Sequence, residues 1–112
     1  MSAVPARFDE EVHAPLRLQL CSALLPVRSA TFPALREALG VSDSVLSKHL
    51  SRLQAVGYVA IDKRAVGGRS RTSAALTEAG RVAVRGHLTA LREIAAAAEA
   101  VEEPAQATIL DR

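Results

Sequence analysis

Residues 33–61, PALREALGVSDSVLSKHLSRLQAVGYVAI, constrain the fold of this chain more than any other stretch. Pro33 suits the first turn of a helix and Gly40 suits its end, so a short helix is predicted between them. Ser42 is a good N-cap for a second helix, which the spacing of the leucines extends to about Val56. Two short helices joined by a tight, glycine-containing turn make a helix-turn-helix unit.

The segments on either side of this unit complete a recognisable order of elements. Leucines that follow Pro15 at helical spacing predict a first helix, which Pro26 stops, and Thr31-Phe32 is predicted to form a minimal strand. After the unit, YVAIDKR and TSAAL alternate as strands do, and AVGGRSR joins them in a hairpin with a somewhat long tip. Thr77 caps a final helix that is predicted to run to about Glu103. The predicted fold class is mainly α with a small β-hairpin (α+β).

The two sides of the predicted helix from residue 42 to 56 differ in chemistry. At about 100° per residue, Leu46, Leu50 and Leu53 cluster on one side. The other side is hydroxylated or basic and carries Ser44, Ser47, Lys48 and Ser51, with Ser42 at the cap and Arg52 near the edge. A solvated helix face more usually mixes acids and bases, whereas this one has no acid between Ser44 and Val56. Small hydroxylated and basic side chains favour insertion into a DNA major groove.

Basic residues also gather in the hairpin. Lys63, Arg64, Arg69 and Arg71 flank Gly67-Gly68, where cations are well placed to contact phosphates or a minor groove. From residue 44 to 85 the chain has eight bases and two acids, although its formal net charge is only +2. Such a basic region on an otherwise acidic chain predicts a polyanionic partner.

The ordered set LSKHL, L-x-x-x-GYV, a basic GGRSRT hairpin and LT-x-x-G resembles the small winged-helix transcriptional regulators of the MarR/ArsR-like group. The resemblance covers about residues 8–95. It implies a homodimer that binds a palindromic operator, with the recognition helix at about 42–56 and the wing, which is the hairpin, at about 63–71. Ala74 and Ala75 stand where relatives often carry an aromatic residue. The cysteine-rich metal-sensing motif of many ArsR-type proteins is absent.

The last predicted helix carries an apolar face that is wider than a lone helix over a small wing can bury. An exposed face of this kind predicts a partner, and a second copy of the chain would match a two-fold operator. The predicted dimer interface consists of Leu16, Leu20, Val84, Leu88, Leu91, Ile94, Ala95 and Ala98. The alternative is that this helix only folds back over the first helix.

Several chemistries are not expected. Cys21 is the only cysteine, so an intrachain disulfide and a cysteine zinc site are excluded, and a buried free thiol is the expected state. His13, His49 and His87 lie far apart in sequence, so we expect no metal or catalytic cluster, and His49 is interpreted as a structural residue beside the apolar stripe. Ser47 and His49 point to different faces of one helix, which argues against an enzyme. We expect no cofactor, no membrane span and a cytoplasmic location.

At 112 residues the chain is predicted to form a single folding unit with four parts. These are a mobile lead-in or short turn (1–12), a winged helix-turn-helix DNA-binding domain (13–80), a dimerisation helix (81–103) and a flexible tail (104–112). The predicted function is a dimeric DNA-binding transcriptional regulator, most simply a repressor that occludes a promoter. Winged helices also serve as protein-interaction modules without DNA, which is the alternative. A small-molecule effector between the first and last helices fits the prediction, but no residues identify it.

Overall fold

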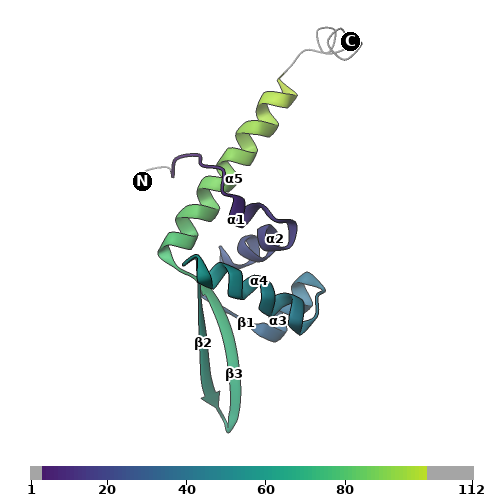
Figure 1. The fold of residues 1–112 in the computed structure, drawn as a ribbon, viewed down its shortest axis with the longest axis vertical. Coiled ribbons are helices and arrows are strands. Elements are labelled where there is room, and N and C mark those ends of the chain that lie inside the picture. Colours follow the sequence, from purple (N-terminus) through teal and green to yellow (C-terminus); the bar gives the residue numbers. More distant parts are fainter. Residues whose placement is uncertain (1–3, 101–112) are drawn as a thin grey trace.

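The chain forms five helices and a three-stranded sheet within residues 4–100, the part described by the structure, a computed structural model (Figure 1). In chain order the elements are α1 (Glu10–His13), α2 (Pro15–Leu24), β1 (Ala30–Thr31), α3 (Phe32–Leu39), α4 (Asp43–Ala55), β2 (Val59–Val66), β3 (Arg69–Leu76) and α5 (Glu78–Glu99). This order confirms the predicted fold class, mainly α with a small β-hairpin. Figure 1 shows the β2–β3 hairpin and α5 extending in opposite directions from the packed helices.

Side-chain caps fix where the main helices begin. Ser42 Oγ accepts a hydrogen bond from the amide of Val45 at 3.3 Å, as expected of an N-cap, and α4 follows directly. Thr77 Oγ1 accepts from the Gly80 amide at 3.0 Å and starts α5. Thr31 Oγ1 accepts from the Ala34 amide, so α3 begins at Phe32 and β1 lies one residue earlier than predicted.

The hairpin is longer and its turn is tighter than the sequence predicts. Strands β2 and β3 pair antiparallel from Val59↔Leu76 to Val66↔Arg69, which leaves Gly67 and Gly68 as a two-residue turn rather than a long tip. Both glycines have positive φ, 56° and 79°, as a type I′ turn requires. The strand order is β1-β3-β2, and Ala30 of β1 pairs with Ala74 of β3.

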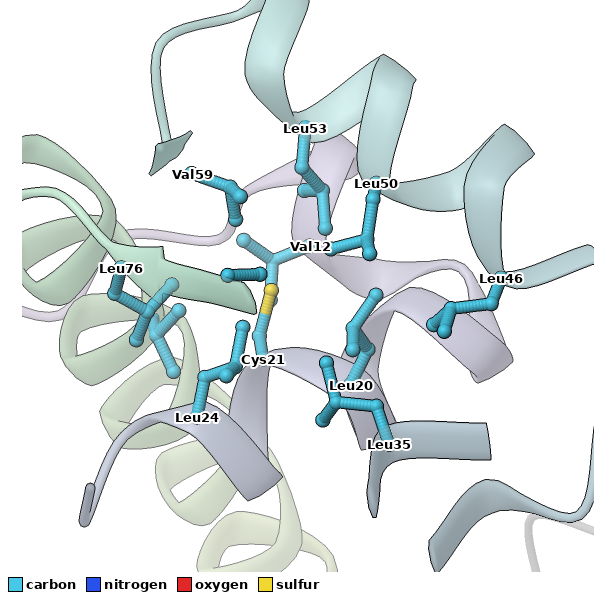
Figure 2. Close-up of a cluster of buried hydrophobic side chains, with 12 residues drawn as sticks. Val12, Leu20, Cys21, Leu24, Leu35, Leu46, Leu50, Leu53, Val59 and Leu76 are labelled. Carbon is cyan, nitrogen blue, oxygen red and sulfur yellow. The ribbon is translucent and has the colours of Figure 1, made fainter. Parts of the chain in front are cut away.

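The core is aliphatic and lies where α2, α4 and the inner ends of the strands meet (Figure 2). Its fully buried side chains include Leu20, Cys21 and Leu24 of α2 and Leu50 and Leu53 of α4. Burial raises the pKa of the Cys21 thiol to about 12, so the thiol stays protonated, as the expected buried free cysteine.

Of the two predictions for the N-terminal segment, a mobile lead-in or a short turn, its described part fits the second. Residues Glu10–His13 form α1, the Asp9 carboxylate caps it by accepting from the amides of Glu11 and Val12, and Val12 is fully buried in the core. A single valine among acidic residues has no periodicity, but its burial attaches the segment to the body of the protein.

Helix α5 is attached to the rest of the fold at its first turn. The α5 backbone at Gly80 lies directly on the Tyr58 carbonyl, leaving no room for a Cβ atom. Arg81 donates to the carbonyls of Leu25 and Val27 at 2.8 and 3.0 Å, so this base satisfies backbone groups that follow α2. Among residues 4–100, no helix combines the length and the apolar character needed to cross a bilayer.

Helix α5 crosses the predicted boundary between residues 80 and 81 and ends at Glu99. From Arg92 to Ala100 every residue is exposed, and Ile94 is 58% exposed. The predicted continuation to Glu103 reaches beyond the described residues, and the predicted tail (104–112) lies outside them.

Candidate nucleic-acid interface

The face of α4 that is opposite the leucines is exposed. Leu46, Leu50 and Leu53 are at most 1% exposed and hold the helix on the core. The predicted DNA contacts on this element, Ser42, Ser44, Ser47, Lys48, Ser51 and Arg52, are all exposed. Asp43, in the first turn, is the one acidic residue of α4.

Helix α4 and the hairpin border a single groove. Ser47, Ser51 and Gln54 line it from α4, and Lys63 and Thr72 line it from β2 and β3. Lys63 and Thr72 are cross-strand partners, so their side chains lie on the same face of the hairpin. The polar face of the helix therefore continues onto one face of the wing.

The other predicted wing bases lie on the opposite face of the hairpin. Arg64 and Arg71 are cross-strand partners, and Arg69 lies two residues from Arg71 on the same face. All three are exposed, and Arg64 is paired with Asp62 at 2.9 Å. Directly opposed like charges destabilise a strand pair, and the Asp62 carboxylate relieves this repulsion at Arg64. Exposed arginines gathered on one face of a hairpin are suited to contact with phosphates.

Two residues that border the surface were missing from the sequence-based set. Gln54 lies three residues after Ser51 and seven after Ser47, which places all three side chains on one face of the helix. This spacing could have identified Gln54 from the sequence. Arg36 of α3 borders a second groove with Arg69 and Arg71, and no local pattern connects α3 to the wing.

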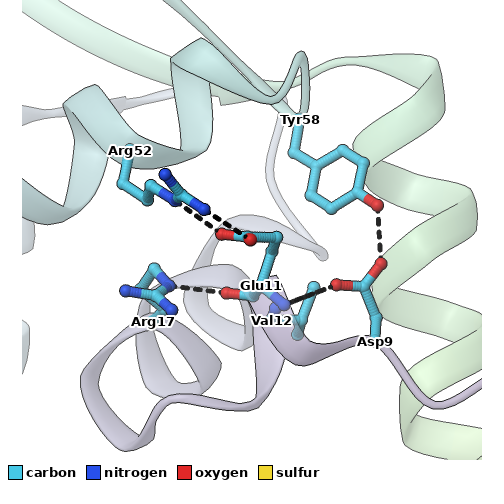
Figure 3. A network of polar contacts seen from close by, with 6 residues as sticks. All are labelled: Asp9, Glu11, Val12, Arg17, Arg52 and Tyr58. Carbon is cyan, nitrogen blue, oxygen red and sulfur yellow. Dashed lines mark hydrogen bonds and ion pairs between the residues drawn. The ribbon is translucent and has the colours of Figure 1, made fainter.

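Arg52 differs from the other predicted contacts because an acid already binds it (Figure 3). Its guanidinium donates two hydrogen bonds of 2.7 Å to the carboxylate of Glu11 in α1. The hydrogen bond with Arg52 lowers the pKa of Glu11, and the same hydrogen bond raises the pKa of Arg52. Asp9, in the same segment, accepts a 2.6 Å hydrogen bond from the hydroxyl of Tyr58. Proximity to α1, which is distant in sequence, was not predicted.

His49 is half-buried beside the leucines of α4. Its Nδ1 is buried and makes no hydrogen bond within the described chain, and burial, helped by Arg17 and Lys48, lowers its pKa. Its position agrees with a structural interpretation.

The other two histidines meet, although the sequence predicted no cluster. His13 Nδ1 and His87 Nε2 are 3.1 Å apart, because α1 packs against α5. His49 is not part of this pair, and residues 4–100 hold no group of three or more metal-ligating side chains.

The predicted dimer residues divide into three groups. Leu20 and Val84 are fully buried within one chain, which corrects their assignment to a dimer interface. Leu16 borders α3 and α4 together with Leu39 and His49, so it faces the helix-turn-helix unit rather than α5. The residues of α5 that follow are half-buried (Leu88 and Leu91) or exposed (Ile94, Ala95 and Ala98).

Comparison with known proteins decides the family. Residues 16–95 match the winged helix DNA-binding domain family, which is most of the chain. The chain belongs to this family. An uncharacterized protein of Methanocaldococcus jannaschii is 30% identical over 73 residues, 65% of this chain and 79% of that protein.

Solved structures agree with this assignment. A transcriptional regulator homologue from Pyrococcus horikoshii OT3 superposes with a TM-score of 0.75 at 26% identity, over 80% of this chain and 88% of that one. A regulator assigned to the MarR family, from Porphyromonas gingivalis, shares the fold with a TM-score of 0.61 at 19% identity, over 83% of this chain and 86% of that one. The predicted winged helix-turn-helix is confirmed, and the fold of this winged helix protein is that of transcriptional regulators.

Proposed function

We propose that the protein is a dimeric repressor that binds a palindromic operator and occludes promoter DNA. In this proposal α4 is the recognition helix and enters the major groove, and the β2–β3 wing contacts the flanking backbone or minor groove. The observation that carries the proposal is the groove shared by Ser47, Ser51 and Gln54 of α4 and Lys63 and Thr72 of the wing. It joins hydroxyl and amide groups, which suit base edges, to a base, which suits phosphate.

The two faces of the wing have different roles in the proposal. Lys63 borders the recognition helix, whereas Arg64, Arg69 and Arg71 lie on the other face of the hairpin. Cations on both faces allow the wing to contact phosphates on either side of a groove. A winged-helix module that binds only protein has no need of this arrangement, so the charge favours DNA.

The end of α5 supports the dimer. Ile94, Ala95 and Ala98 form an exposed apolar stripe that continues from the half-buried Leu88 and Leu91. A second copy packed on this stripe would bury it, and a two-fold pair would present two recognition helices to two half-sites.

Selection of bound sequences from random duplex DNA with the purified protein tests the proposal. A two-fold symmetric consensus is expected, with half-sites about one helical turn apart. Absence of any enriched sequence would contradict it and favour the interaction-module alternative.

A further inference from the structure

His87 is the only polar or charged side chain that is fully buried among residues 4–100. It lies on α5, and each of its ring nitrogens has a hydrogen-bond partner. Nδ1 accepts a 2.9 Å hydrogen bond from the Asp9 amide, and Nε2 lies 3.1 Å from Nδ1 of His13. The ring of Phe8 covers the pair, with its centroid 4.6 Å from the centroids of both imidazoles.

These contacts determine where the protons are. A backbone amide only donates, so His87 Nδ1 carries no hydrogen and its single proton is on Nε2. Nε2 then donates to His13 Nδ1, which must also be free of hydrogen, and His13 carries its proton on Nε2. Both rings are neutral in this arrangement. His87 Nε2, which carries a proton, offers no lone pair to a metal ion.

The pair attaches a segment that reaches the recognition helix. The Arg7 amide donates to the Gly86 carbonyl at 3.0 Å, next to His87, and extends the contact of the segment with α5. Further along, Asp9 binds Tyr58, and Glu11 binds Arg52 of α4 (Figure 3). Residues 5–13 therefore connect the buried histidine to a predicted DNA contact.

We propose that His13 and His87 form a proton-sensitive latch, which holds residues 5–13 closed on α5 when both rings are neutral and opens when the pair gains a proton. A proton added to His13 Nδ1 would face the proton on His87 Nε2. A proton added to His87 Nδ1 would displace the Asp9 amide. Opening removes Glu11 from Arg52, and the consequence for DNA rests on the function proposed above.

The charged surroundings of His87 set the direction of the effect. Desolvation by burial lowers the pKa of His87, His13 lowers it further, and the Asp9 carboxylate opposes both. That carboxylate already accepts from the Tyr58 hydroxyl and from two amides of α1. On α2, Arg17 donates to the Glu11 carbonyl, and on α5 the positions one turn from His87 carry no charge. The closed state thus binds a proton less readily than the open state, and acid below about pH 6.5 favours opening.

Two probes report the latch directly. Hydrogen exchange of the Asp9 amide follows its bond to His87, and emission of Tyr58, the only tyrosine in a chain without tryptophan, follows its bond to Asp9. Between about pH 8 and about pH 5.5 we expect the Asp9 protection factor to fall at least about tenfold while α4 remains folded. Unchanged protection over this range would overturn the latch.

A matched pair of variants assigns the transition. Position 13 is exposed, and in His13→Asn the amide keeps an acceptor near the position of Nδ1 but cannot be protonated. Opening then requires protonation of buried His87, so the midpoint of the transition moves to lower pH. His49→Asn removes the histidine outside the pair and leaves the transition in place. The assignment of the pH transition to His13 and His87 would be overturned if its midpoint in His13→Asn equalled that of the wild type. It would also be overturned if His49→Asn shifted the midpoint as much as His13→Asn does.

Duplex binding separates the latch from its consequence. Acidification should increase the DNA affinity of the wild type several-fold more than that of Glu11→Gln, in which the pair with Arg52 is already absent. If the protection of the Asp9 amide falls with pH but DNA affinity changes equally in both proteins, the latch stands and only its coupling to Arg52 is overturned. Absence of DNA binding at every pH would contradict the proposed function, whatever the Asp9 amide shows.

Discussion

The Arg52 guanidinium donates two 2.7 Å hydrogen bonds to the Glu11 carboxylate and so joins α4 to α1, 41 positions earlier in the chain. Bidentate geometry of this kind is also how arginine binds phosphate. In the proposed DNA complex, Glu11 would therefore compete with a DNA phosphate for the same guanidinium and would limit how strongly the end of α4 attracts DNA.

Removal of the Glu11 charge should release Arg52. In Glu11→Gln we expect tighter binding to duplexes of any sequence, and a plot of log affinity against log salt that is steeper by about one unit, because one more phosphate is contacted. Fluorescence anisotropy at several salt concentrations measures this slope. Glu10→Gln, at the neighbouring exposed position, changes the net charge equally and serves as the control. Equal slopes for the two variants would show that Arg52 is not released onto DNA.

Tyr58 provides a titration that reports the N-terminal segment. Its hydrogen bond to Asp9 raises its pKa to about 12, with burial as the second cause. The folded state thus retains the phenolic proton more strongly than the unfolded state, so this contribution to stability is present below about pH 10 and is lost as the pH rises towards 12. Absorbance of the single tyrosine follows the ionisation.

In Asp9→Asn the pKa of Tyr58 should move back towards its ordinary value. Glu78→Gln removes an exposed acid that borders the same groove as Tyr58 and should leave the ionisation near pH 12. A tyrosine that titrates identically in Asp9→Asn and in the wild type would show that the Asp9 contact does not form in solution.

Gly80 is required by the close approach of α5 to Tyr58, the residue before β2. A Cβ atom at this position would collide with the Tyr58 carbonyl, which is backbone and cannot rotate away. We expect Gly80→Ala to lower the free energy of unfolding by about 1–3 kcal/mol, despite the better helix propensity of alanine. Urea denaturation measures the change, with Ala79→Ser at the exposed neighbouring position as a nearly neutral control. A Gly80→Ala protein as stable as the wild type would mean that α5 does not contact Tyr58 as described.

The exposed stripe at the end of α5 tests the proposed dimer. Ala98→Lys places a charge on the stripe of Leu91, Ile94 and Ala95, whereas Ala96→Lys places the same charge on the other side of the helix. An unpaired charge in the interface should cost about 3 kcal/mol, which is a roughly 150-fold weaker dimer. Sedimentation equilibrium should show dissociation of Ala98→Lys at concentrations where Ala96→Lys stays dimeric. The same association constant for both would exclude this stripe from the interface.

The helix-turn-helix was predictable from sequence because its signals are local. The cap at Ser42 and the leucine spacing of α4 lie within a few residues of the structure they specify. A turn at Gly67-Gly68 was predicted, but with too long a tip, because the residues beside the glycines do not alternate apolar and polar as a strand does. Cross-strand pairing extends both strands to the glycines.

The role of the N-terminal segment could not be predicted from local pattern. His13 and His87 are 74 residues apart, and neither belongs to a motif that specifies the other. Likewise, Glu11 appears only as one acid in a run, and its contact with Arg52 depends on the packing of α1 against α2 and α5. Burial of Leu20 and Val84 within one chain depends on the same packing, so periodicity alone assigned them to the dimer.

DNA reading by α4 is tested most directly by the ratio of affinities for the selected operator and for a scrambled duplex, measured at fixed salt in wild type and two double variants. Lys48→Ala with Ser51→Ala, on α4, should reduce the ratio by about five- to 150-fold, as expected for the loss of contacts to base edges. Arg69→Ala with Arg71→Ala, on the wing, should weaken both duplexes alike, leave the ratio unchanged and flatten the salt slope by about one to two units. If the α4 variant keeps the wild-type ratio, α4 does not read the operator.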